Sequence, residues 1–326
     1  MKCFVTGGTG FIGYRLVESL SEKGYLINVL VRREKDFENK FQNVTVFEGD
    51  LFNIDILEKA INGCEYIFHL AAYANLWSKD KTLAYRTNFT GTQNILELAL
   101  KHKIKKVIFT SSAATLPPAK DLELVDESFP IPEKYLTEYE TTKQQAEQLC
   151  IAYTKKGLDI VIVNPSRVYG PGFLNKSNSL TILIKKYIEG KWRIIPGDGT
   201  QIGNYAFIDD VVSGHIQALE RGRSGERYIL GGTNASFNTF FSILADISGK
   251  KYRLLHLPLP VMMFIARFEL FMAETFGKKP LITPPWIRRY QQNRPLSVEK
   301  ARREIQYSIT TLELGIEKTV KWLKTI

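Results

Sequence analysis

The glycine-rich stretch TGGTGFIG, residues 6–13, constrains the fold of this 326-residue chain more than any other feature. It follows the apolar run KCFVT (2–6) and precedes a segment with helical spacing of apolar residues. Three glycines here allow a sharp turn, close approach of the backbone to a pyrophosphate, and tight packing of helix on strand. A strand-to-helix turn that binds nothing would not need all of them. We therefore expect a dinucleotide site with contacts from Gly7, Thr9, Gly10, Phe11, Ile12 and Gly13.

Apolar strands alternate with helices through the first half of the chain. Strands are predicted at 2–6, 25–31, 44–47, 65–70, 106–110 and 158–163, and helices at 11–23, 55–61, 83–101 and around Tyr139. In the less regular second half, small strands are predicted near 205–208 and at 227–230. Strands that are apolar throughout indicate a parallel sheet covered on both faces. We predict an α/β fold, a Rossmann-type doubly wound parallel sheet with a smaller, mostly helical C-terminal substrate domain. The expected boundaries are 1–170 and 171–326, with 202–232 returning to the first domain.

Composition narrows the class of protein. The formal net charge is +10, but Lys and Arg are spread along the whole chain and form no block with interleaved aromatic residues, so we expect no nucleic-acid partner. The three cysteines and four histidines show neither a disulfide framework nor metal-ligand spacing, so no metal is expected. A strand that begins at residue 2 leaves no room for a signal peptide, and a cytoplasmic location is expected.

The most apolar segment lies late in the chain, from Leu254 to Phe276. Two prolines and three charged side chains interrupt it, so it is too broken to be an integral membrane segment. Three interpretations stay open for it: a core helix, the wall of an apolar pocket, or a helix in peripheral contact with a membrane surface. The basic, partly apolar character of the chain also leaves a homodimer open.

TEYETTK, residues 137–143, places Tyr139 and Lys143 one helical turn apart on the same face. Thr137 followed by Glu140 has the pattern of a capping box, so a helix should begin here. A free tyrosine has a pKa of about 10. We expect a nearby ammonium and the positive nicotinamide ring of a bound dinucleotide to lower the pKa of Tyr139 until the phenol can act as a general acid or base. Alone, this spacing more often marks a solvated helix face, so the interpretation depends on its surroundings.

Several motifs together resemble the extended branch of the short-chain dehydrogenase/reductase superfamily, the NAD-dependent epimerase/dehydratase superfamily. They are the glycine spacing G-x-x-G-x-x-G, GDL at 49–51, HLAA at 69–72, TSSA at 110–113, the Tyr139–Lys143 pair and YGPG at 169–172. The resemblance covers most of the chain. The second half is similar to dihydroflavonol reductase-like, 3β-hydroxysteroid dehydrogenase-like and hopanoid-associated sugar epimerase-like proteins, in FGKKPLITPPW (276–286) and LSVEKARREI (296–305).

The resemblance implies roles for individual residues. Ser112, with Ser111 as the alternative, would hydrogen-bond the substrate oxygen, and Lys143 would donate to the nicotinamide ribose. Asn88 would order a proton relay, although an Asn on a helix is often only a local hydrogen-bonder. Cofactor contacts are implied for Asp50, Leu51, Leu70, Ala71, Ala72, Thr110, Ser111, Tyr139, Lys143, Pro165 and Val168. Substrate contacts are implied for Tyr73, Ser112, Ala113, Tyr139 and Arg167, in a pocket drawn from Tyr73–Trp77, Leu116–Pro118, Val168–Leu174 and the C-terminal helices.

Arg32 and Arg33 follow the second predicted strand, where an enzyme that prefers NAD usually has an acidic residue for the ribose 2′-OH. Guanidinium groups suit a 2′-phosphate in charge and in geometry, so NADP is the expected cofactor. Two solvated arginines are the alternative reading. Glu34 and Asp36 weaken the case for NADP, and NAD stays open.

The expected reaction is NADP(H)-dependent hydride transfer between nicotinamide and a carbonyl or secondary alcohol of a small, lipophilic substrate, with Tyr139 as general acid/base. Dehydratases of the resembling family follow the active serine or threonine with Asp-Glu, whereas Ala113 and Ala114 follow Ser112. Its nucleotide-sugar epimerases carry Arg-Asp-Tyr-Ile-His, whereas this chain has GNYAFIDD (203–210) without an arginine. A sugar or nucleotide-sugar epimerase with tightly bound NAD(P) stays open, as does, more remotely, a non-catalytic NADP-binding sensor or scaffold.

Overall fold

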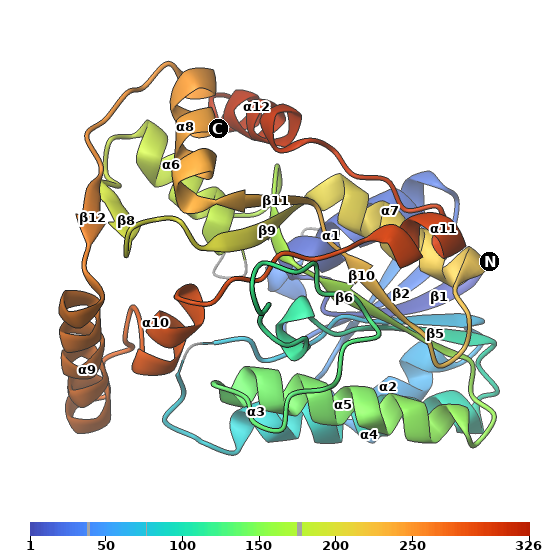
Figure 1. Cartoon of the computed structure of the whole chain (residues 1–326). Coiled ribbons are helices and arrows are strands. Elements are labelled where there is room, and N and C mark those ends of the chain that lie inside the picture. Colours follow the sequence, from blue (N-terminus) through green and yellow to red (C-terminus); the bar gives the residue numbers. More distant parts are fainter. Residues whose placement is uncertain (38–39, 76, 175–177) are drawn as a thin grey trace.

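Seven parallel strands form the central sheet of the computed structural model, which describes residues 1–37, 40–75, 77–174 and 178–326 (Figure 1). Their order is β10-β6-β5-β4-β1-β2-β3. The bounds are β1 (Lys2–Thr6), β2 (Leu26–Val31), β3 (Val44–Glu48), β4 (Tyr66–His69), β5 (Lys106–Thr110), β6 (Ile160–Pro165) and β10 (Arg227–Leu230). The order reverses at β1, as in a doubly wound sheet, so the predicted Rossmann-type fold is confirmed.

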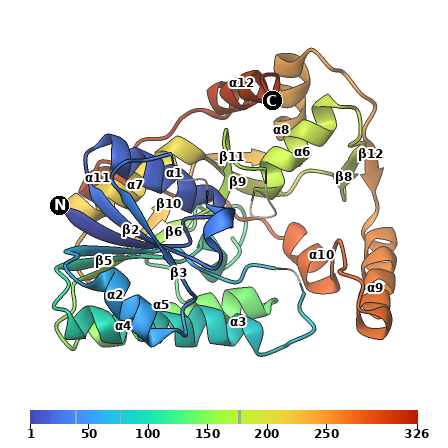
Figure 2. The same ribbon diagram turned by 180° about the vertical axis from the view of Figure 1, so that it is seen from behind.

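Helices cover both faces of this sheet (Figures 1 and 2). One face carries α1 (Phe11–Glu22), α7 (Ile208–Arg221) and α11 (Glu299–Ile305), and the other carries α2 (Ile54–Ile61), α4 (Gly91–Lys101) and α5 (Glu138–Thr154). Successive residues of a strand therefore enter different cores: Phe4 packs in one hydrophobic cluster and Val5 in the other. Burial on both faces explains why the strands are apolar throughout.

The long helix predicted at 83–101 is interrupted. The structure has α3 (Leu83–Tyr85), a π-helical segment (Arg86–Thr90) and then α4. A π-helical turn inserts one residue into the hydrogen-bond ladder and is found mostly at functional sites. Asn88 lies within this turn and is fully buried. Apolar periodicity does not distinguish such a turn from a regular helix, so the sequence prediction was wrong at this point.

The second half is helical with two small sheets. The predicted strands near 205–208 and at 227–230 correspond to β9 and β10, whereas four short strands were not predicted. One sheet joins β11 (Thr233–Ser236), β9 (Ile202–Phe207) and β7 (Arg167–Tyr169), and the other joins β12 (Leu255–Leu257) and β8 (Ile194–Pro196). Three helices pack around them: α6 (Ser179–Ile188), α8 (Phe237–Ser248) and α12 (Leu312–Leu323). A three-residue strand is too short for the alternation that would reveal it in a sequence.

The apolar segment near the C-terminus forms α9 (Leu259–Phe276), which is followed by α10 (Pro284–Tyr290). Both views place α9 at the outer edge of the molecule, with α10 between it and the central sheet (Figures 1 and 2). Phe264 in α9 is 73% exposed, so the interpretation of this segment as a core helix is wrong. Among the described residues, no helix combines the length and the apolar character needed to cross a membrane.

Candidate active site

The turn between β1 and α1 brings backbone against backbone. Gly7 has a φ of +77°, and a Cβ atom built on it would lie 2.7 Å from the amide nitrogen of Ala71. A Cβ on Gly13 would overlap the carbonyl oxygen of Gly7. Gly10 caps α1 without a side chain, and the first turn of the helix contains no acidic residue. The turn therefore has the close backbone packing and the positive helix end that suit a pyrophosphate.

A buried histidine fixes the loop that faces this turn. The Thr6 hydroxyl lies 2.7 Å from Nδ1 of His69 and accepts a hydrogen bond from the Ala71 amide at 3.2 Å. Nε2 of His69 lies 2.9 Å from the Thr92 hydroxyl. Burial, assisted by the positive charge of Lys143, lowers the pKa of His69 to about 3, so the imidazole is neutral. We did not single out Thr6 or His69 from the sequence, although His69 begins the HLAA motif.

The other predicted cofactor residues lie along the carboxyl edge of the sheet. The loop after β4 contains Leu70, Ala71 and Ala72. Strand β5 ends at Thr110 and is followed by Ser111, β6 ends at Pro165, and β7 contains Val168. Arg32 and Arg33 are exposed directly after β2. Asp50 accepts hydrogen bonds from the amides of Phe52 (2.8 Å) and Asn53 (3.1 Å), so its carboxylate shapes the turn before α2. The Leu51 side chain is buried in the core.

The capping box predicted at the start of α5 is confirmed. The Thr137 hydroxyl accepts from the Glu140 amide at 3.2 Å, and the Glu140 carboxylate accepts from the Thr137 amide at 3.0 Å. This arrangement fixes where α5 begins and so places Tyr139 in its first turn. Lys143 follows one turn later and is 1% exposed. The pair therefore does not lie on a solvated face of the helix.

Tyr139 meets Ser112 at the end of β5. The Ser112 side chain lies close enough to the Tyr139 phenol to act on its pKa, and the Ser112 hydroxyl accepts from the Ala114 amide at 3.2 Å. The Ser111 hydroxyl is buried without a partner among the described residues, so Ser112 is the serine that reaches the tyrosine. Burial raises the pKa of Tyr139, while Ser112 and the charge of Arg289 act in the opposite direction. Lys143 is not among the groups that act on this pKa.

Lys143 is held by residues of β5. Its Nζ donates to the Thr110 carbonyl at 2.7 Å and lies 4.2 Å from the centre of the Phe109 ring. Burial lowers the pKa of Lys143 to about 8, and the nearby Cys150 and Glu147 oppose that shift. The ammonium is thus fixed by β5, at the sheet edge where the glycine turn also lies.

Asn88 ties the loop after β4 to α5. Its Oδ1 accepts from the Tyr73 amide at 2.7 Å, and its Nδ2 donates to the Tyr73 carbonyl at 3.1 Å and the Thr142 hydroxyl at 2.9 Å. The Tyr73 hydroxyl donates to the Trp77 carbonyl at 3.2 Å. Asn88 therefore holds the predicted pocket segment that begins at Tyr73 against α5, the helix that carries Tyr139. Leu76, within the predicted stretch Tyr73–Trp77, lies outside the described residues.

Three neighbouring arginines begin at Tyr139: the charge of Arg289 acts on the phenol, Arg294 repels Arg289, and Arg167 repels Arg294. Sequence reasoning found only Arg167 among them. Arg289 of α10 forms an ion pair with Oε1 of Glu140, and Nη2 of Arg294 lies 3.8 Å from the same oxygen. Arg294 also donates to the Leu116 carbonyl at 3.0 Å. Arg167 lies 5.3–5.8 Å from the ring centres of three aromatic residues, Tyr205, Phe237 and Tyr290. Burial, and then repulsion by Arg294, lowers the pKa of Arg289 to about 9.

This cluster holds more positive charge than its carboxylate can balance. Glu140 is 1% exposed and serves both as the capping-box residue of α5 and as the partner of Arg289. The sequence WIRRYQQNRP (286–295) reads only as a basic stretch, since nothing in it indicates that the Arg289 side chain of α10 reaches the start of α5. The one sequence signal for this contact was the position of the capping-box residue Glu140 directly after the candidate Tyr139.

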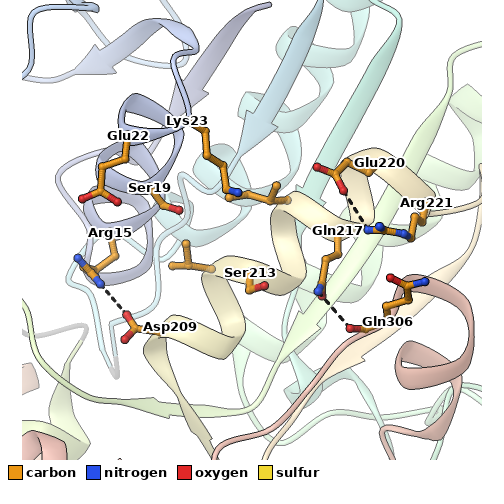
Figure 3. Close-up of a pocket in the computed structure, with 12 residues that line it drawn as sticks. Arg15, Ser19, Glu22, Lys23, Asp209, Ser213, Gln217, Glu220, Arg221 and Gln306 are labelled. Carbon is orange, nitrogen blue, oxygen red and sulfur yellow. Dashed lines mark hydrogen bonds and ion pairs between the residues drawn. The ribbon is translucent and has the colours of Figure 1, made fainter.

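A separate groove of about 300 Å³ lies between α1 and α7 (Figure 3). Arg15 of α1 and Asp209 of α7 form an ion pair of 2.7 Å across it. Its lining contains none of the residues predicted to bind cofactor or substrate. The groove is therefore distinct from the candidate active site.

Residues 3–231 match the sequence profile of the NAD dependent epimerase/dehydratase family. The chain belongs to this family of enzymes. Over 328 residues it is 33% identical to a Synechocystis protein named "Putative dihydroflavonol 4-reductase", covering 98% of this chain and 94% of that protein. It is 30% identical to the mouse sterol-4-alpha-carboxylate 3-dehydrogenase, decarboxylating, covering 98% and 90% of the two chains. The resemblance inferred from the motifs is thereby confirmed.

Solved structures agree with this assignment. The crystal structure of gox2253 superimposes with a TM-score of 0.83 at 29% identity and covers 99% of this chain and 98% of that one. The UDP-glucuronic acid 4-epimerase of Bacillus cereus, in complex with UDP-glucuronic acid and NAD, superimposes with a TM-score of 0.79 at 27% identity, covering 100% and 99%. The family thus includes both net oxidoreductases and epimerases.

Proposed function

We propose that this protein is an NADP(H)-dependent oxidoreductase that transfers a hydride between nicotinamide and a carbonyl or secondary alcohol, with Tyr139 as the general acid/base. The observation that carries the proposal is the meeting of Tyr139 and Ser112 at the end of β5, beside Lys143. These hydroxyls lie at the carboxyl edge of a parallel sheet, where open α/β folds bind their ligands.

The residues present fit a dinucleotide. Gly7 and Gly13 leave no space for a Cβ atom, which supports a close backbone cradle for the pyrophosphate. The Ser111 and Ser166 hydroxyls follow β5 and β6, and both are buried without a partner among the described residues. Lys143 would donate to the nicotinamide ribose, and Arg32 with Arg33 would hold the 2′-phosphate. When bound, the nicotinamide supplies or accepts the hydride.

The proton moves through Tyr139. Burial raises the pKa of this phenol, so it carries its proton at neutral pH and can give it to the substrate oxygen during reduction. Ser112 hydrogen-bonds the same oxygen and fixes its position. The phenolate that remains is stabilised by the positive charge of Arg289. In the oxidative direction the same groups run in reverse, with Tyr139 removing the alcohol proton.

The arginine cluster supports a substrate with an anionic group near the reacting carbon. Arg289 and Arg294 share the buried carboxylate of Glu140, and Arg167 repels Arg294, so an added carboxylate or phosphate would reduce the repulsion among the three. The name of the mouse relative specifies a sterol carboxylate, which combines an apolar body with such a group. We propose a lipophilic hydroxy acid or keto acid as the substrate class.

The experiment is a panel of keto acids and neutral ketones assayed with NADPH by the loss of nicotinamide absorbance. Tyr139→Phe should lower kcat roughly 100- to 10,000-fold on the best substrate. Tyr153→Phe is the matched control, since this residue lies at the far end of α5 and donates only to Glu97. Full turnover by Tyr139→Phe would refute the mechanism. Conversion of a sugar substrate without net loss of NADPH would instead identify an epimerase.

A further inference from the structure

Helix α9 has its amphipathic pattern reversed. The residues that it buries are Met262, Ala266 and Ala273, which share one side of the helix. The residues that it exposes are larger: Phe264, Phe268 and Phe271 are 73%, 56% and 58% exposed. Monomeric proteins rarely present so many contiguous aromatic side chains to water without a binding role. We refer to Val261, Phe264, Ile265, Phe268, Phe271 and Phe276 as the apolar face of α9.

Basic residues surround this face. Between residues 251 and 290 there are seven Lys and Arg residues and two Glu residues, a surplus of five positive charges. This segment therefore holds half of the net charge of +10 carried by the whole chain. Among its basic side chains, Arg267 lies within α9 and Lys278 and Lys279 directly follow it, all of them exposed. Leu281, just beyond them, is 82% exposed.

A cavity of about 390 Å³ links the end of α9 to the loop after β4. Phe276 and Gly277 line one side of it, and Trp77, Lys79 and Lys81 line the other. Nζ of Lys81 lies 5.4 Å from the centre of the Trp77 ring. A tryptophan beside lysines and exposed phenylalanines is the side-chain combination found where proteins meet the headgroup region of a bilayer.

We propose that α9 docks flat on an anionic lipid membrane, with its apolar face among the acyl chains and the surrounding lysines and arginines at the headgroups. A helix with an aromatic face and basic flanks binds in the plane of the interface through these two contributions. The loop that carries Trp77 also carries Tyr73, which Asn88 holds beside α5. Docking therefore places the predicted substrate side of the active site next to the bilayer.

Charge complementarity favours a membrane over a second copy of this chain as the partner that covers the apolar face of α9. Two copies that met through the apolar face would bring their basic surroundings together, and like charges at an interface are unfavourable. A membrane with anionic headgroups supplies the opposite charge. The docking inference does not depend on the proposed reaction, because binding to vesicles can be measured without turnover.

The test is sedimentation of the full chain with vesicles of phosphatidylcholine alone or mixed equally with phosphatidylglycerol. We expect binding to the anionic vesicles, much weaker binding to the neutral ones, and release at high salt. Replacing Phe264, Phe268 and Phe271 together by Ser should weaken binding at least about tenfold. Lys278→Gln with Lys279→Gln should weaken it roughly 10- to 30-fold. The matched control replaces the exposed Leu26, Leu122 and Leu314 by Ser and should bind as the unmodified protein does.

Three results would overturn the proposal. Two of them are failure of the unmodified chain to bind anionic vesicles and binding that survives the triple Phe replacement. The third is a dimer, seen by light scattering, that the triple replacement dissociates while vesicles remain unbound, because this result assigns the face to a second copy. Hydride transfer on a water-soluble substrate should be unchanged in the Phe variant, so failure of docking and failure of the proposed reaction are distinguishable.

Discussion

The cofactor side of the candidate site is built from backbone, and the substrate side is built from long side chains. Around Gly7 and Gly13 the chain packs so closely that a methyl group would not fit. Across the sheet edge, Arg289 and Arg294 reach Glu140 from a segment about 150 positions later in the chain. Backbone that must pack closely restricts residue type locally, whereas an ion pair from a distant segment restricts only charge.

The largest expected effect lies on the substrate side. Among the described residues, Arg289→Leu leaves the more distant Arg294 as the cation that pairs with the buried Glu140 carboxylate, and removing one partner of a buried pair costs about 3–5 kcal/mol. The free energy of unfolding, measured with urea, should fall by that amount. Arg288→Leu is the matched control, because Arg288 is exposed on the same helix.

A double variant distinguishes the effect of the lost ion pair on stability from the effect of lost side-chain packing. Adding Glu140→Gln to Arg289→Leu removes the unpaired charge while keeping a side chain that can serve the capping box. The double variant should recover much of the lost stability. If Arg289→Leu alone unfolds at the same urea concentration as the unmodified protein, the cluster does not hold α10 against α5.

The cofactor side should respond to a smaller change. A methyl group in Gly13→Ala must displace the Gly7 backbone, and overpacking of this kind costs about 1–3 kcal/mol. Because the displaced backbone forms the cradle, dinucleotide affinity should fall at least about tenfold in a fluorescence titration. Gly24→Ala is the control. The φ of +78° at Gly24 strains an alanine, so stability should change, but the added Cβ would meet nothing within 4 Å, so dinucleotide affinity should not change. Equal affinity losses in the two variants would contradict a specific role for the turn.

The same contrast explains how much the sequence could predict. The glycine turn, the strands of the large sheet and the capping box at Thr137 were predicted because each depends on neighbours close in sequence. The π-helical turn at Asn88 was missed, since one inserted residue barely alters apolar periodicity. Arg289 and Arg294 were missed because their partner lies in another element.

The pKa of Tyr139 shows a further limit of sequence reasoning. The i, i+4 spacing predicted that Lys143 would lower this pKa, yet the ammonium is drawn to the Thr110 carbonyl, and Arg289 is the cation that acts on the phenol. Spacing along a helix fixes which residues share a face. It does not fix where a four-carbon side chain places its charge or how strongly burial opposes ionisation.

Lys143 itself gives a pH-dependent prediction. Its pKa is about 8 in the folded protein and about 10.4 in an unfolded chain, so between these values the unfolded state binds more protons. The free energy of unfolding, relative to Lys143→Met, should therefore rise by roughly 1–2 kcal/mol as the pH passes from 8 to 10. Activity should fall over the same range, because the ammonium loses its charge. A difference in stability that stays constant with pH would show that Lys143 is not shifted.

The smallest expected effect concerns the choice between NADP and NAD, because Arg32 and Arg33 are exposed and water competes with them for a phosphate. Replacing both by Ala should weaken NADPH binding about 3- to 5-fold and leave NADH binding unchanged, since only the 2′-phosphate is affected. Lys35→Ala, an exposed cation two residues further on, serves as the control and should leave both affinities unchanged. If the unmodified protein binds NADH as tightly as NADPH, the two arginines are ordinary surface residues. The cofactor side of the site would then be defined by its backbone alone.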